Sequence, residues 1–143
     1  MAQRLAKLRQ LLNNQRLTAY VLPRTDEHQS EYITERDERV QWISGFSGSS
    51  GLGLVSQKEA LLWTDSRYFI QAQKELYQGW QLKKMLPGGQ KWFEYVLANY
   101  PKMSRIGFDP TLITASTVSP TDRKRIGKSK NIQGKRHLIR PYP

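Results

Sequence analysis

The 143-residue sequence contains no cysteine and only two histidines. The missing cysteines exclude disulfides, thiol nucleophiles and thiolate metal sites, and they agree with a reducing compartment. The histidines, His28 and His137, lie 109 residues apart and form no His-x3-His motif. We therefore expect no metal site, and no metal-dependent hydrolysis, from this chain alone.

Long hydrophobic runs are also missing. No stretch approaches the roughly 20 consecutive apolar residues that a membrane-spanning helix needs. In residues 1–15, apolar and polar side chains recur with the spacing of an amphipathic helix, so this stretch is not the apolar core of a secretory signal. An apolar fraction of 38% with 24% charged residues is ordinary for a soluble domain. We expect a cytoplasmic protein that does not associate with membranes.

Acidic residues are scarce at the C-terminal end. From Thr121 to Pro143 there is one acid, Asp122, against eight Lys or Arg, so this segment carries +7 of the net charge of +11. Its few apolar residues cannot bury enough surface to offset the entropy lost on ordering. We expect residues 1–116 to form one domain and residues 117–143 to be a basic, weakly structured tail.

Apolar periodicity up to residue 108 alternates between the helical and the strand pattern. Helices are predicted at 2–15, around 40–43, at 65–76 and at 91–99, and strands at 18–22, 52–55, 60–63, 80–85 and 105–108. The short spacing of the second and third strands predicts an antiparallel hairpin. The fold class predicted is α/β, a single domain with a mixed β-sheet flanked by helices.

Two polar segments are candidate functional sites. The loop after the first predicted strand holds the charged cluster Asp26, Glu27, His28 and Glu31. Asp65, Arg67 and Tyr68 lie at a predicted strand-to-helix junction. The pattern alone favours structural roles: a solvated loop for the cluster, a helix cap for Asp65, and for Arg67 a surface cation whose stem packs on Trp63.

A glycine- and serine-rich stretch at residues 45–51 is predicted to be a flexible turn. It lacks the Gly-x-Ser-x-Gly spacing of a nucleophile elbow, and no Gly-Lys-Ser/Thr follows it to hold a phosphate. No catalytic constellation is therefore visible in the residue pattern.

Five stretches, taken in order, resemble the creatinase/prolidase N-terminal domain, specifically that of the aminopeptidase P (Xaa-Pro aminopeptidase) group. They are residues 25–33 (TDEHQSEYI), 39–51 (RVQWISGFSGSSG), 62–69 (LWTDSRYF), 71–72 (QA) and 106–110 (IGFDP). The resemblance covers roughly residues 3 to 115. It implies an α/β domain placed ahead of a "pita-bread" catalytic domain.

The resemblance also implies a function. Such cytoplasmic enzymes remove the N-terminal residue from peptides with proline second. Their catalytic domain binds two divalent metals, usually manganese, through two Asp, one His and two Glu, and activates a bridging water. By this resemblance, none of these metal-binding residues lies in this chain. The N-terminal domain helps to build dimers and shapes the substrate entrance, which His28, Asp65, Arg67 and Tyr68 would border by analogy.

The sequence departs from the family after Asp109-Pro110, where a family member continues into its catalytic domain. We therefore expect a truncated family member, from a shifted reading frame or a truncated gene copy, that is inactive alone. The alternative is a binding module whose basic tail contacts nucleic acid or a protein partner. Nucleic acid is the weaker interpretation, because the tail lacks interleaved aromatic residues and any recognisable docking motif.

Overall fold

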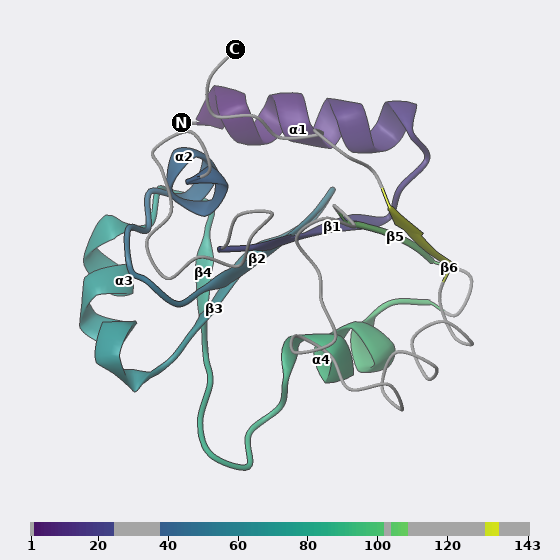
Figure 1. The fold of residues 1–143 in the computed structure, drawn as a ribbon. Helices are drawn as coiled ribbons and strands as arrows, with labels where there is room; N and C mark the ends of the chain where they lie inside the picture. The colour runs from purple at the N-terminus through teal and green to yellow at the C-terminus, as the bar shows by residue number, and fades with distance from the viewer. Residues whose placement is uncertain (1, 25–37, 102–103, 109–130, 135–143) are drawn as a thin grey trace.

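The computed structural model describes residues 2–24, 38–101, 104–108 and 131–134, which contain both helices and strands (Figure 1). The helical elements are α1 (Ala2–Asn14), α2 (Arg39–Ser44), the 3-10 turn η2 (Ser66–Tyr68), α3 (Phe69–Glu75) and α4 (Trp92–Asn99). The strands are β1 (Ala19–Pro23), β2 (Leu52–Ser56), β3 (Ala60–Thr64), β4 (Gln81–Lys84), β5 (Arg105–Phe108) and β6 (Asn131–Gly134). The predicted order of elements from α1 to β5 is confirmed, and β6 is an addition.

All six described strands belong to one mixed sheet in the order β4-β3-β2-β1-β5-β6. Strand β2 is antiparallel to both of its neighbours, β1 and β3, which confirms the predicted hairpin. The pairs β3–β4, β1–β5 and β5–β6 are parallel. The predicted fold class, an α/β domain with a mixed sheet flanked by helices, is confirmed.

Helices cover both faces of this sheet. In Figure 1, α1 runs along one face, with α2 and α3 on the same side, and α4 lies against the other. The central strand β1 serves both cores because successive side chains point to opposite faces. Tyr20 and Leu22 pack with the leucines of α1, whereas Ala19 and Val21 pack on the side of Val96 in α4.

Strand β6 lies in the segment that composition predicted to be weakly structured. Its backbone pairs with β5 from Arg105↔Asn131 to Phe108↔Gly134. An edge strand is ordered by backbone hydrogen bonds to its neighbour, which no side-chain pattern reveals. The division of the chain at residue 116 stays a prediction, because most of the tail lies outside the described residues.

The helix predicted at residues 65–76 is divided in the structure. The 3-10 turn η2 spans Ser66–Tyr68, and α3 continues from Phe69 to Glu75, one residue short of the predicted end. Leu76 leaves the helical conformation with ψ 131°, and the backbone N–H of Tyr77 donates to the carbonyl of Ser44. A tertiary hydrogen bond therefore follows directly after the end of the helix. None of the helices in the described ranges combines the length and the apolar character that crossing a membrane requires.

Candidate functional site

Two of the segments that resemble the family, residues 45–51 and 65–68, meet beyond one end of the central strands β1, β2 and β3. Strand β2 begins at this end, where Leu52 pairs with Pro23 at the end of β1 and with Trp63 near the end of β3. The loop 45–51 before β2 therefore lies beside the turn 65–68 after β3. We call these two segments together the motif edge.

The turn begins with a capped 3-10 helix. The Asp65 carboxylate accepts a hydrogen bond from the backbone N–H of Arg67 at 3.1 Å, which confirms its predicted capping role. The same carboxylate accepts from Nε and Nη2 of Arg67, both at 2.9 Å. The hydrogen bonds from Arg67 lower the pKa of Asp65, so this carboxylate stays charged across the neutral range.

Arg67 keeps most of its side chain in solvent, with 66% of it exposed. Its guanidinium lies over the ring of Tyr68, 5.0 Å from the centroid. The Tyr68 hydroxyl is hydrogen-bonded to the Ser49 hydroxyl of the neighbouring loop, and this contact lowers the pKa of Tyr68. The Tyr68 ring also meets the buried ring of Phe46 edge-to-face at 5.8 Å. Arg67 is thus an exposed cation on a fixed aromatic platform.

A carboxylate of α3 holds the start of the loop. Glu75 accepts hydrogen bonds from the backbone N–H of Ser47 at 2.9 Å, from its hydroxyl at 2.7 Å, and from Nε2 of Gln71 at 3.0 Å. Burial opposes the charged form of Glu75, but these donors outweigh it and lower the pKa of the carboxyl. The loop is therefore tied to α3 through a charged acceptor.

The end of the loop is tied to the sheet. The Thr64 hydroxyl donates to the carbonyl of Ser50 at 2.6 Å, and the backbone N–H of Arg24 donates to the carbonyl of Gly51 at 2.9 Å. The Arg24 side chain also forms an ion pair with Glu38 at 2.6 Å, with both side chains largely buried. A sequence pattern typical of a flexible turn is thus held at both ends.

The motif edge is suited to binding. Its groups are an exposed guanidinium, an aromatic ring and serine hydroxyls, all of which can donate or accept hydrogen bonds. No group of three His, Cys, Asp or Glu that could hold a metal ion occurs among the residues that the structure describes. An exposed arginine beside an aromatic ring can contact a carboxylate or a peptide carbonyl.

Three of the four sequence-predicted site residues, Asp65, Arg67 and Tyr68, are brought together here, and His28 lies outside the described residues. Sequence reasoning did not identify Glu75 and Ser47 as partners. The one sequence signal for this network is the run of serines in residues 45–51, whose hydroxyls can form hydrogen bonds. The side chains that complete the network come from α3, more than twenty residues away along the chain.

Comparison with known proteins assigns the family. The sequence pattern of the Creatinase/Prolidase N-terminal domain matches residues 4–133 of this chain. Xaa-Pro aminopeptidase 2 of Homo sapiens is 40% identical over 128 residues, which is 90% of this chain and 19% of that protein. A probable Xaa-Pro aminopeptidase P of Laccaria bicolor is 39% identical over 139 residues, 96% of this chain and 22% of that protein.

A solved structure agrees. The crystal structure of X-prolyl aminopeptidase from Caenorhabditis elegans, described as a cytosolic enzyme with a di-nuclear active site, superimposes with a TM-score of 0.83 at 39% identity. The match covers 94% of this chain and 23% of the nematode chain. The present chain thus spans about a fifth of the length of these relatives. It belongs to the creatinase/prolidase N-terminal domain family and is homologous to the N-terminal region of Xaa-Pro aminopeptidases.

Proposed function

We propose that this chain acts as the non-catalytic N-terminal domain of an Xaa-Pro aminopeptidase, and that its motif edge borders a peptide entrance or a subunit interface. The observation that carries the proposal is the meeting of residues 45–51 and 65–68 at one end of the central strands. Exposed polar groups held on a rigid frame are typical of a binding surface.

Arg67 is the residue best suited to contact a peptide. Its guanidinium is paired with Asp65 on one side, and its exposed remainder can still donate to a carboxylate or carbonyl oxygen. The Arg67 guanidinium also lies over the ring of Tyr68, and the Tyr68 hydroxyl is hydrogen-bonded to the hydroxyl of Ser49. The peptide would meet a preorganised cation, because the local contacts already orient the side chain.

The catalytic chemistry would come from a metal centre built by residues other than those described here. Two divalent metals, as the family resemblance implies, would there activate water and polarise the scissile carbonyl. In this proposal the chain contributes position and access, not a reacting group. Homodimerisation and a cytoplasmic location, which the resemblance also implies, stay predictions, and light scattering coupled to size-exclusion chromatography would measure the first.

The direct test exchanges domains between relatives. Residues 4–133 of this chain replace the corresponding segment of the nematode enzyme, and hydrolysis of Xaa-Pro peptides is measured with added Mn²⁺. We expect the chimera to retain hydrolysis and the isolated 143-residue chain to show none above the blank. Turnover by the isolated chain would contradict its non-catalytic role.

A variant within the chimera tests the motif edge. Arg67→Ala removes the exposed cation, and we expect KM for the peptide to rise roughly threefold or more with a smaller change in kcat, as for a half-solvated charged contact. Lys7→Ala, on the exposed face of α1, is the matched control and leaves KM unchanged. Equal effects of the two substitutions would rule out a specific role for the motif edge.

A further inference from the structure

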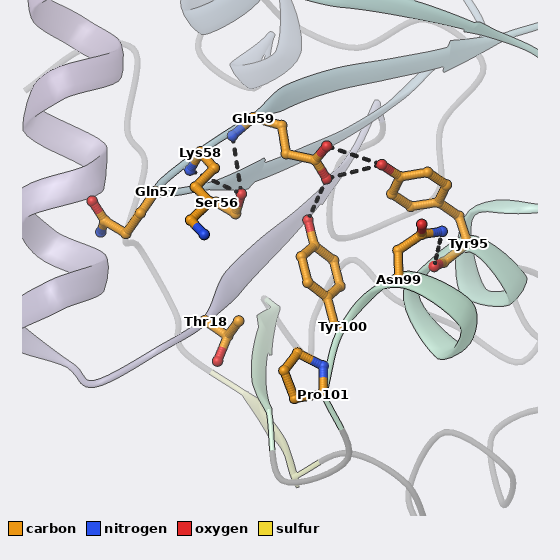
Figure 2. Close-up of a pocket in the computed structure, with 9 residues that line it drawn as sticks. All are labelled: Thr18, Ser56, Gln57, Lys58, Glu59, Tyr95, Asn99, Tyr100 and Pro101. Carbon is orange, nitrogen blue, oxygen red and sulfur yellow. Dashed lines mark hydrogen bonds between the residues drawn. The ribbon is translucent and has the colours of Figure 1, made fainter.

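A pocket opens at the other end of the central strands, away from the motif edge, where the β2–β3 turn faces the end of α4 (Figure 2). The cavity measures ≈ 530 Å³, and its wall includes Ser56, Lys58 and Glu59 on one side and Tyr95, Asn99 and Tyr100 on the other. Small-molecule sites measure about 300–1,000 Å³ and carry a few placed polar groups on a largely apolar wall. The pocket therefore has the size for a small molecule or a single side chain.

Glu59 is the polar centre of this pocket. Its Oε1 accepts from the Tyr95 hydroxyl at 2.9 Å, and its Oε2 accepts from the Tyr100 hydroxyl at 2.9 Å. Burial, and then the hydrogen bond to Glu59, raise the pKa of Tyr95. Burial also raises the pKa of Tyr100 above its usual range, and Glu59 adds to the effect. Both phenols are therefore neutral donors that aim a carboxylate into the pocket.

Lys58 also lines the pocket. Neither it nor any other Lys or Arg of the described residues forms an ion pair with Glu59, so the carboxylate is left without a paired cation. Two phenol hydrogen bonds leave lone pairs on the carboxylate. The Asn99 amide donates through Nδ2 to the carbonyl of Tyr95, so its oxygen is also left as an acceptor. Unused acceptors around a carboxylate favour a ligand that is positive and rich in donors.

The walls around this carboxylate are aromatic. The Tyr95 and Tyr100 rings meet edge-to-face with centroids 6.4 Å apart. The Tyr95 ring already attracts one ammonium of the chain, the Nζ of Lys83, which lies 4.8 Å from its centroid. Aromatic faces beside a carboxylate are the usual surroundings of a bound ammonium group. They also give an apolar stem a surface on which to pack.

We propose that this pocket binds an organic cation, a primary ammonium on an apolar stem, with Glu59 as its counter-ion and Tyr95 and Tyr100 as its walls. The ammonium donates to the free lone pairs of Glu59 and to the Asn99 oxygen, and the stem lies against the rings. This site does not rest on the proposed peptidase role, because it uses residues at the other end of the central strands.

The test titrates the complete, isotope-labelled chain with n-butylammonium chloride and, separately, with the uncharged 1-butanol. Sodium chloride keeps the ionic strength constant, and NMR follows the resonances of Tyr95, Tyr100 and Asn99. We expect saturable shifts with n-butylammonium at a Kd that is roughly millimolar, the strength of one partly desolvated charged contact on aromatic walls. Butanol should shift these resonances without saturation.

Two variants isolate the charge. Glu59→Gln keeps the size and one carbonyl acceptor for the tyrosines, and we expect it to bind n-butylammonium about tenfold more weakly. Glu94→Gln makes the same charge change on α4 outside the pocket and should bind like the parent chain. Equal binding of n-butylammonium and butanol, or an unchanged Kd in Glu59→Gln, would overturn the proposal. The comparison of the two ligands on the parent chain holds even if Glu59→Gln fails to fold.

Discussion

Asp65 caps a turn and holds a guanidinium with the same carboxylate, and both contacts go to Arg67, two residues away. Because they are local, the residue order alone predicted the cap. The bond between Ser49 and Tyr68 spans nineteen residues and depends on the hairpin that brings the two segments together. No local pattern could predict that pairing, although both residues lay in segments that resembled the family.

Gly45 ends α2 in a left-handed conformation, with φ 88°. A Cβ there would lie 2.5 Å from the carbonyl oxygen of Glu75. We expect Gly45→Ala to destabilise the chain by roughly 2–4 kcal/mol, since the left-handed penalty and the steric clash add. Gly88→Ala, at φ 76° with open space around its Cβ, should cost only about 1 kcal/mol. Urea unfolding measures both, and equal destabilisation by the two substitutions would contradict the steric argument.

The Glu75 carboxylate is expected to make stability depend on pH. Its folded pKa is lowered, so its contribution is present above the unfolded value of 4.5 and is lost as pH falls through the folded pKa. The free-energy difference between the parent chain and Glu75→Gln should therefore shrink below pH 4.5. Urea unfolding at several pH values measures it. Ser47→Ala removes one donor and should weaken the same dependence, whereas a difference independent of pH would refute this role.

At the scale of elements, β6 occupies one edge of the sheet and β4 the other. The β4 edge carries Lys83 and Lys84, which are typical of an exposed edge that avoids pairing with other chains. Strand β6 covers β5 through backbone pairing. The fold therefore uses part of the basic tail to complete its sheet, although composition predicted little structure there.

Truncation tests the contribution of β6. A chain that ends at residue 130 lacks the strand, whereas a chain that ends at residue 134 keeps it and serves as the control. We expect the shorter chain to lose roughly 1–3 kcal/mol of unfolding free energy, because a few backbone hydrogen bonds no longer form. Amide hydrogen exchange along Arg105–Phe108 should also become faster. Equal protection in the two chains would mean that β6 adds nothing to the stability of β5.

At the scale of the whole molecule, the net charge of +11 is concentrated in residues 121–143. Binding of nucleic acid by this segment stays a prediction, because only residues 131–134 of it are described. Deleting the segment would also delete β6, so a loss of binding could come from the lost charge or from a less stable fold. Substitution of cations outside the strand separates the two effects.

The triple variant Arg123→Gln, Lys124→Gln, Arg125→Gln tests the alternative function. If the tail binds phosphates, DNA affinity should fall, and the salt dependence of binding should weaken by about 0.9 in log–log slope for each phosphate that the variant no longer neutralises. Fluorescence anisotropy with a labelled duplex at several salt concentrations measures both. Replacing three exposed cations of the domain, Lys7, Lys74 and Lys91, by Gln is the matched control. An unchanged affinity in the tail variant would exclude this segment as the binding surface.

The sequence by itself determined the α/β class, the element order up to β5 and the membership of the family, because apolar periodicity and short motifs are local properties. The tertiary structure alone decided that residues 45–51 and 65–68 lie at the same end of the central strands, that Glu75 accepts from Ser47, and that Glu59 accepts from two tyrosines. It also decided the place of β6 in the sheet. These features depend on contacts between distant segments, which form only when strand pairing sets their register and so brings those side chains within bonding distance.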